Sequence, residues 1–355
     1  MSLKSRHFGL DLLRVIACYL VIQVHAGEFF YIGEGGTVLS GAGPYWVNLF
    51  NTSGRAAVPL FIMITGYFVL PVKNNVSDFF RKRFTRVTVP FIIWCVLYAL
   101  YKFFMKETDL QGMFINILKI PVNFGTEIGH LWYIYMLIGL YLFFPVISPW
   151  ITSASRKAIN LYLIIWSTTL LLPYIHQVFP EILGECYWNN TPLLYYFSGF
   201  LGYAILGAYM KKYYSQKATY DSLLGFTLLV IGFIITAGIF YIRLSSESTV
   251  PELELSWGYG TVNVAMMAIG LFLILKNRSD KKEGIVKKAV TGISNMSYGM
   301  YLAHIMILNF FYFLLNGLID EIWIKLPLLS VCTFVVSYYL IKIISYLPKS
   351  KYIIG

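Results

Sequence analysis

Apolar runs of about 20 residues recur along the whole chain, and no other feature restricts its fold as strongly. A helix of about 20 apolar residues is long enough to cross the hydrocarbon core of a bilayer. The composition agrees, because 58% of the residues are hydrophobic and only 13% are charged, whereas soluble domains carry about 25% charged residues. The sequence therefore predicts an all-α polytopic membrane protein that resides in the lipid bilayer.

The spacing of the apolar runs predicts about ten transmembrane helices. The expected spans are 10–30, 55–72, 87–105, 131–150, 158–176, 192–210, 222–243, 256–275, 297–316 and 326–347. The first run lacks the small-residue cleavage site of a signal peptide and is too long for one. The connections are short, so we expect a single membrane-embedded domain over residues 1–355.

The basic residues predict the orientation of the chain in the membrane. If the N-terminus is cytoplasmic, most of the 28 Lys and Arg residues lie in cytoplasmic segments, and most of the 17 acidic residues lie outside. Cytoplasmic loops of membrane proteins are enriched in Lys and Arg, so both termini are expected to be cytoplasmic. The same distribution explains the net charge of +11. We expect no nucleic-acid partner, because the chain has no soluble basic domain.

The cysteine residues predict neither a disulfide nor a metal site. Cys18, Cys95, Cys186 and Cys332 are scattered along the chain without pairing or metal-ligand spacing. A thiol inside a helix behaves as a small hydrophobic group. We therefore expect no metal.

Two ionisable residues interrupt the first apolar run, GLDLLRVIACYLVIQVHAG (residues 9–27). Arg14 and His25 are eleven positions apart, which in an α-helix gives about 16 Å of rise and returns to nearly the same face. Ionisable groups within a membrane usually face a cavity or a partner, which favours a shared polar channel. The alternatives are an interfacial Arg14 paired with Asp11 and a buried His25 bonded to a neighbouring helix.

A basic cluster precedes the third span, in FFRKRFTRVTVPFIIW (residues 79–94). Guanidinium groups hold phosphates by charge-assisted and often bidentate hydrogen bonds. Arg81, Arg83 and Arg86 are therefore candidate phosphate ligands. The alternative is that this cluster only sets the topology of the chain.

Polar and aromatic residues mark the expected outer side. GTEIGHLWY (residues 125–133) brings Glu127, His130 and Tyr133 to the mouth of the fourth span, where they suit a sugar-binding surface or an interfacial aromatic belt. Arg55 is expected at the outer start of the second span, against the positive-inside trend. We therefore include it among the candidate substrate-binding residues.

Five segments, in order, resemble the acyltransferase family 3 membrane proteins, which O-acylate sugars and other acceptors of the bacterial envelope. They are the Arg and His of the first helix, SGRAAVPLFIMITGYFVL (53–70), FFRKRFTRVTVPFIIW (79–94), HLWYIYMLIGLYLFFPVI (130–147) and SNMSYGMYLAHIMIL (294–308). The resemblance extends over roughly residues 9–310. It implies a standalone membrane domain of such an enzyme in the bacterial cytoplasmic (inner) membrane.

The resemblance also implies an activity and its residues. The enzyme would move an acyl group, most commonly acetyl, from cytoplasmic acyl-CoA to a hydroxyl of an extracytoplasmic glycan or lipid-linked sugar. His25 would be the catalytic residue, as a general base or as a transiently acylated nucleophile. Arg14, with the basic cluster, would bind acetyl-CoA. His304 resembles a family position for which we expect a structural hydrogen bond, and Glu28 lies one turn from His25, where it could orient the imidazole.

A transporter or flippase of a small polar solute or lipid-linked sugar is the alternative function. About ten helices, intramembrane polar residues, and prolines such as Pro59 and Pro90 also suit alternating access. Against it, the sequence has no inverted repeat, and Arg14 and His25 lie on one helix. A small-molecule delivery module is a third possibility, because the family includes membrane domains fused to amino-acid racemases, although we expect no fused enzyme here.

Overall fold

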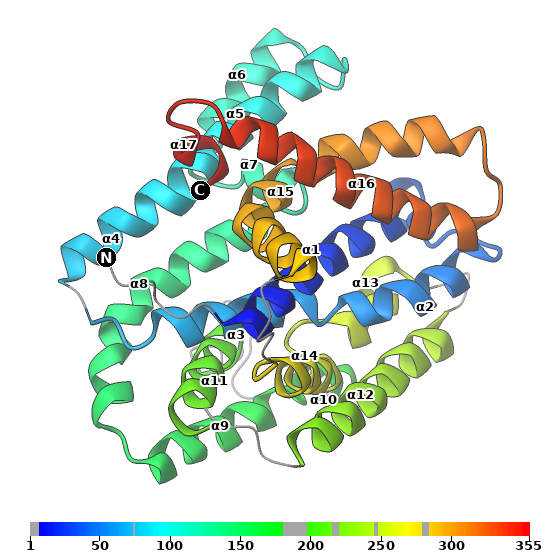
Figure 1. Ribbon diagram of the computed structural model, residues 1–355. Coiled ribbons are helices and arrows are strands. Elements are labelled where there is room, and N and C mark those ends of the chain that lie inside the picture. Colours follow the sequence, from blue (N-terminus) through cyan, green and yellow to red (C-terminus); the bar gives the residue numbers. More distant parts are fainter. Residues whose placement is uncertain (1–6, 74, 180–196, 215–219, 245–247, 279–283) are drawn as a thin grey trace.

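The computed structural model describes residues 7–73, 75–179, 197–214, 220–244, 248–278 and 284–355 (Figure 1). Helices form nearly all of its regular structure, and the described residues contain no strand beyond isolated bridges such as Ile32–Val38. In this part of the chain, nine helical segments are long and apolar enough to cross a membrane. The predicted all-α polytopic membrane fold is confirmed.

The helices, in chain order, are α1 (Phe8–Glu28), η1 (Glu34–Gly36), α2 (Gly43–Gly54), α3 (Ala57–Val69), α4 (Val76–Arg83), η2 (Phe84–Thr88), α5 (Val89–Phe104), α6 (Leu110–Leu118), α7 (Phe124–Glu127), α8 (Trp132–Ser153), α9 (Arg156–Thr169), α10 (Leu172–Val178), α11 (Phe200–Tyr213), α12 (Asp221–Arg243), α13 (Val250–Leu253), η4 (Glu254–Trp257), α14 (Val262–Leu275), α15 (Ile285–Asn316), α16 (Ile322–Ser345) and α17 (Lys351–Ile354). The predicted span 192–210 lies partly outside the described residues, and its described part forms α11. The orientation of the termini stays a prediction.

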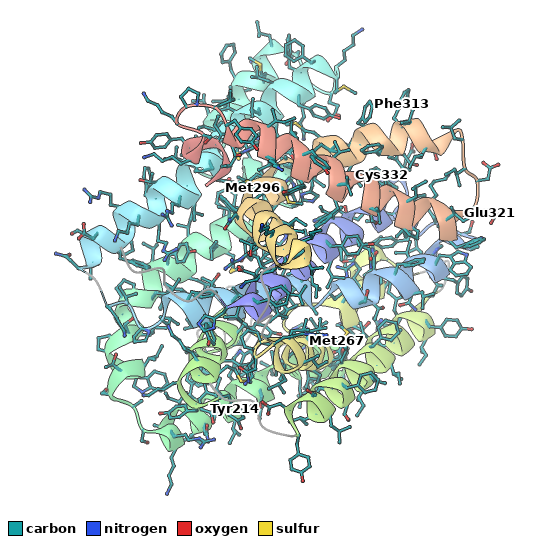
Figure 2. All side chains as sticks on the ribbon, viewed as in Figure 1. Tyr214, Met267, Met296, Phe313, Glu321 and Cys332 are labelled. Atoms are coloured by element: carbon teal, nitrogen blue, oxygen red, sulfur yellow. The ribbon has the colours of Figure 1, made fainter. Side chains whose placement is uncertain are left out.

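Helix α1 lies at the centre of the molecule (Figure 1). It contacts α2, α3, α14, α15 and α16, and it buries Leu10, Leu13 and Ala17 completely. Outer elements instead expose apolar side chains. Phe313 projects outward from α15 (Figure 2), and Ile242 of α12 is 82% exposed. Most of α1 is therefore enclosed by protein, whereas the outer helices present the apolar surface that lipid requires.

Prolines shape the helices that carry two of the predicted arginines. A proline cannot donate a hydrogen bond to the carbonyl four residues earlier. For Pro59 that carbonyl belongs to Arg55, where α2 ends and α3 begins. The second predicted span, 55–72, starts later than the helical structure, which already begins at Gly43 with α2. For Pro90 the carbonyl is that of Arg86, which lies in the π-helical turn η2.

Glycines bring α3 and α11 into backbone contact. A Cβ atom added at Gly66 would lie 2.0 Å from the carbonyl oxygen of Ala204, and one at Gly207 would lie 2.0 Å from that of Met63. Small residues allow such close approach between membrane helices. The contact fixes α3, which supplies one wall of the cavity described below.

Candidate active site

A cavity of about 380 Å³ lies between α1, α3, α8 and α15, with η2 also on its wall. This volume is within the usual range for small-molecule sites. Six of the candidate site residues predicted from the sequence line it: Arg14, His25, Arg83, Arg86, His130 and Tyr133. The fold therefore joins residues that are far apart in the sequence around one space.

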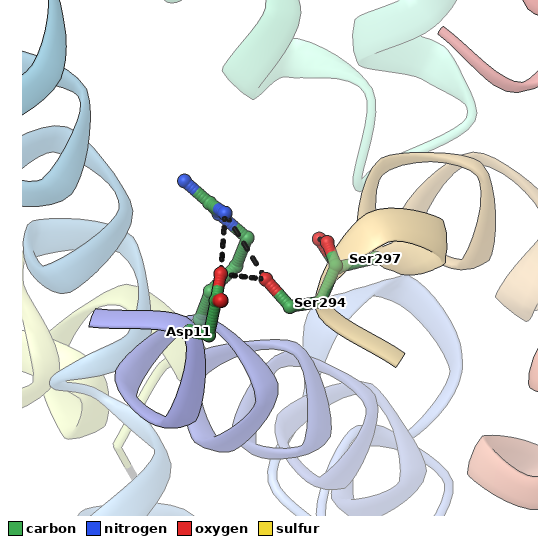
Figure 3. Close-up of polar contacts among 4 residues, drawn as sticks. Asp11, Ser294 and Ser297 are labelled. Atoms are coloured by element: carbon green, nitrogen blue, oxygen red, sulfur yellow. Dashed lines mark hydrogen bonds and ion pairs between the residues drawn. The ribbon is translucent and has the colours of Figure 1, made fainter. Parts of the chain in front are cut away.

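Arg14 is held at the cavity wall by a polar network between α1 and α15. Its Nη1 donates to Ser294 Oγ at 3.0 Å, and Ser294 Oγ donates to Asp11 Oδ1 at 2.7 Å (Figure 3). The same Nη1 lies 3.4 Å from Asp11 Oδ1. Arg14 thus pairs with Asp11, as one alternative predicted, and also lines the cavity. The Asp11 carboxylate, 5% exposed, balances its charge.

Arg83 and Arg86 join Arg14 on the cavity wall, whereas Arg81 does not. Both line the cavity, and the Arg83 Cζ lies 5.3 Å from the centre of the Tyr141 ring. Arg81 is exposed and its Nη2 lies 3.4 Å from Asp78 Oδ1. The helical turn α4 directs Arg81 away from the cavity, so the sequence cluster divides into cavity and surface residues.

His25 has its tautomer set by a carboxylate one turn further along α1. His25 Nδ1 lies 2.9 Å from Glu28 Oε1. An ionised carboxylate only accepts hydrogen bonds, so Nδ1 carries the hydrogen and Nε2 of the neutral ring keeps its lone pair. This is the arrangement that a general base or a nucleophile requires.

Two further imidazoles surround His25. The ring centres of His25 and His304 are 5.3 Å apart, those of His25 and His130 are 6.0 Å apart, and those of His130 and His304 are 4.7 Å apart. His130, predicted at the mouth of the fourth span, lies in the turn before α8, is 1% exposed and lines the cavity. Burial, followed by the His304 and His25 rings, holds the pKa of His130 well below its ordinary value.

His304 makes the structural hydrogen bond expected of it. Its Nδ1 lies 2.6 Å from the carbonyl oxygen of Tyr301, and the Tyr301 hydroxyl donates to the carbonyl of His130. His304 Nε2 and both ring nitrogens of His130 are buried without a hydrogen-bond partner among the described residues. Buried polar atoms without partners are uncommon and invite a functional explanation.

The other two predicted substrate residues, Arg55 and Glu127, are not among the residues that line the cavity. Glu127 Oε1 is 3.4 Å from Lys119 Nζ on the surface. Arg55 is buried at the α2–α3 break, with its Cζ 3.9 Å from the centre of the Trp257 ring. Both fall outside the lining of the cavity.

The structure adds aromatic residues that sequence reasoning did not assign to the site. Trp132 and Tyr259 both line the cavity, and their rings stack with centres 5.8 Å apart and planes at 24°. Trp132 belongs to the HLWY segment and was detectable there. Tyr259 follows η4 in a segment without a motif, so only the fold reveals its position.

Among the residues that the structure describes, no group of three or more His, Cys, Asp or Glu side chains has the geometry to hold a metal ion. Cys18, Cys95 and Cys332 are free thiols, while Cys186 lies outside the described residues. The cavity lining carries imidazole, guanidinium, hydroxyl, amide and aromatic groups.

Comparison with known proteins identifies a family. A family model described as an acyltransferase domain matches residues 7–342. An amino-acid racemase of Enterococcus faecalis is 28% identical over 137 residues, which are 37% of this chain and 18% of that protein. A serine/alanine racemase of Enterococcus gallinarum is 27% identical over 139 residues, again 37% of this chain and 18% of that protein. The matches thus cover less than a fifth of these relatives. No solved structure matches.

Proposed function

Because the chain belongs to the acyltransferase family 3, whose model spans residues 7–342, we propose that this membrane acyltransferase is an O-acyltransferase of the bacterial inner membrane. It takes an acyl group, in the first instance acetyl, from cytoplasmic acyl-CoA. It transfers this group to a hydroxyl of an extracytoplasmic glycan or lipid-linked sugar. The proposed orientation places both termini in the cytoplasm.

One observation carries the donor assignment: the cavity connects Arg14, Arg83 and Arg86 with His25. The phosphates of coenzyme A suit guanidinium groups, which bind them by charge-assisted hydrogen bonds. The helix rise from Arg14 to His25 is about 16 Å, which is of the order of the length of the pantetheine arm. A coenzyme A bound through its phosphates near Arg14 would present its thioester to His25.

His25 supplies the chemistry at the other end of this path. Glu28 holds Nδ1, so Nε2 is free to act. In one route, Nε2 takes the proton of the acceptor hydroxyl while the hydroxyl oxygen attacks the carbonyl carbon of the thioester. In the other, Nε2 attacks the thioester and carries the acyl group as acyl-histidine. A covalent acyl group on His25, trapped and located by mass spectrometry, would support the second route.

The proposed acceptor side is formed by aromatic groups, of which Tyr133 is predicted from the sequence. Trp132, Tyr133 and Tyr259 line the cavity. Aromatic faces with a polar tip combine an apolar contact surface with a hydrogen-bonding group, which suits the mixed surface of a sugar. The expected roles of Arg55 and Glu127 in substrate binding stay predictions.

Donor binding is the first experiment, because it does not require the acceptor. Purified protein in detergent is melted with acetyl-CoA, with coenzyme A or without ligand. A ligand at 100 times its dissociation constant stabilises a protein by about 2.7 kcal/mol. We expect this stabilisation for the wild type and its loss in Arg14→Ala. Arg81→Ala is the matched control, because Arg81 belongs to the same predicted basic set but lies outside the cavity, and it should behave as wild type.

Two other outcomes would contradict the proposed donor site. Absence of stabilisation at millimolar acetyl-CoA would contradict the proposed donor and favour the transporter alternative, which solute uptake in vesicles would then test. Equal losses in the Arg14 and Arg81 variants would indicate a general charge effect instead of a cavity site.

A further inference from the structure

The His304 ring is fixed with one nitrogen as a hydrogen-bond acceptor. Its Nδ1 lies 2.6 Å from the Tyr301 carbonyl oxygen, which can only accept. Nδ1 therefore carries the hydrogen, and Nε2 of the neutral ring keeps a lone pair. This Nε2 is buried and lacks a partner among the described residues, so it is ready to accept a hydrogen bond from a neighbouring donor.

His130 is the neighbour whose ring N–H can donate this hydrogen bond. The rings in contact with His304 are those of His25, Tyr301 and His130. The Nδ1 hydrogen of His25 is directed to Glu28, and the Tyr301 hydroxyl donates to the His130 carbonyl. Both ring nitrogens of His130 are without a partner in the described part of the chain, and its ring is the nearest to His304, with centres 4.7 Å apart.

A bond from His130 to His304 would fix the tautomer of His130. A neutral imidazole has one N–H, so donation to His304 leaves the other nitrogen with a lone pair. His130 lines the cavity, as His25 does, and their ring centres are 6.0 Å apart. The two rings of His130 and His304 are not bonded in the structure, so a turn of the His130 ring is part of the inference.

We infer that His130 is a hydrogen-bond acceptor in the cavity, set by His304 and Tyr301, and that the enzyme takes an acceptor substrate with two neighbouring hydroxyl groups, one for each imidazole of His25 and His130. The inference rests on the proposed function, with His25 as the general base. The expected acceptor is then a vicinal diol, that is, a compound with hydroxyl groups on two adjacent carbon atoms, rather than any sugar.

The two hydroxyl groups have different roles in the reaction. The first gives its proton to His25 Nε2, and its oxygen forms a bond to the thioester carbonyl carbon. The carbon–sulfur bond breaks, and the thiolate of coenzyme A leaves and receives the proton from His25. The second hydroxyl keeps its proton and donates it in a hydrogen bond to His130. A site built to bind a hydroxyl strongly rejects an analogue that lacks it, because its own polar group is then left unpaired.

The test uses two small alcohols as probes, cis-cyclohexane-1,2-diol and cyclohexanol, with acetyl-CoA as donor. Release of coenzyme A is followed with a thiol reagent, and the acetyl ester is identified by mass spectrometry. We expect the wild type to prefer the diol by at least about tenfold in kcat/KM. His130→Phe should reduce this preference to about one while acetyl-CoA still stabilises the protein.

Two substitutions of His304 separate positioning from structural support. The amide of His304→Asn reaches only the place of Nδ1, so it keeps a donor for the Tyr301 carbonyl but removes the acceptor at Nε2. The amide of His304→Gln reaches the place of Nε2 and restores an acceptor there. We expect the diol preference to be lost in the Asn variant and retained in the Gln variant. The reverse order would show that His304 only supports the fold.

The outcomes distinguish this inference from the proposed function. If the wild type binds acetyl-CoA but acetylates both alcohols equally, or neither, the diol requirement is wrong and the donor assignment stands. Retention of the diol preference in His130→Phe would also overturn it. If acetyl-CoA neither stabilises the protein nor releases its thiol, the proposed function itself fails.

Discussion

The two polar sites on α1 differ in how completely their groups are paired. At Arg14, the Asp11 carboxylate and the Ser294 hydroxyl lie beside the guanidinium, and Ser294 is hydrogen bonded to both Arg14 and Asp11. Around His25, the ring nitrogens of His130 and Nε2 of His304 have no partner among the described residues. At the first site the charge of Arg14 is paired before a ligand binds. At the second site, ring nitrogens remain that can accept a hydrogen bond from a ligand.

This difference has an energetic meaning. A buried polar group without a hydrogen bond costs about 1–3 kcal/mol. The imidazole cluster is therefore expected to contribute less to stability than the Arg14 network. Proteins tolerate such local cost at functional sites, where activity needs groups that the fold leaves unpaired. Substitutions at the two sites should consequently have opposite effects on stability and activity.

The largest effect is expected for His25→Ala. Removal of the general base or nucleophile should lower acetyl transfer by at least about 10²–10⁴-fold, because His25 is the cavity imidazole whose Nδ1 lies beside the Glu28 carboxylate. Thermal stabilisation by acetyl-CoA should remain, since the arginines are unchanged. Thiol release and melting in parallel measure both quantities. Substantial transfer by the variant would remove His25 from the mechanism.

Asp11→Asn sharpens the contrast from the other site. The substitution removes the carboxylate that balances Arg14, and we expect a loss of about 1–2 kcal/mol in the free energy of unfolding, because Arg14 is partly exposed. The freed charge of Arg14 should bind an anionic donor more tightly, so the stabilisation by acetyl-CoA should increase. Melting with and without acetyl-CoA measures both changes. A smaller ligand shift would mean that Asp11 acts by orienting Arg14.

Glu28→Gln tests the tautomer of His25. An amide can present its nitrogen to Nδ1, which would then hold the lone pair and leave Nε2 protonated. We expect a loss of about tenfold in kcat, which is less than for a buried triad carboxylate because Glu28 is 42% exposed. KM for acetyl-CoA should be unchanged. A change confined to KM would place Glu28 in substrate binding instead.

The sequence predicted the helical membrane fold well, because a bilayer demands long apolar runs that are visible without any tertiary information. The pairing of Arg14 with His25 on one face followed from helix geometry alone. Both expectations depend on local periodicity. Nine membrane-capable helical segments lie in the described residues, where the sequence predicts about ten, and the predicted span 192–210 lies partly outside those residues. The segment that contains the second predicted span begins earlier than expected, at Gly43.

The composition of the site depended on contacts that periodicity does not encode. Arg81 and Arg83 are two residues apart, yet only Arg83 lines the cavity. Ser294 meets Arg14 across 280 residues of sequence. Likewise, His130 lies in the turn before α8, far from His25 in the sequence, yet the centres of the two rings are 6.0 Å apart. Such long-range contacts arise from tertiary packing, so a single sequence leaves them open.

The smallest effect, but the sharpest contrast, is expected for the stability of His130→Phe. Phenylalanine keeps a planar ring and removes two buried nitrogens that have no partner in the described structure. Replacement of an unpaired polar group by an apolar one of similar shape is neutral or stabilising, so the protein without ligand should unfold at the same temperature as wild type or slightly higher. Leu10→Ala, a truncation of a fully buried side chain on α1, is the control that should lower stability by about 2–5 kcal/mol. A marked loss of stability in His130→Phe would show that His130 is already hydrogen bonded in the resting protein, and the two sites on α1 would then be alike.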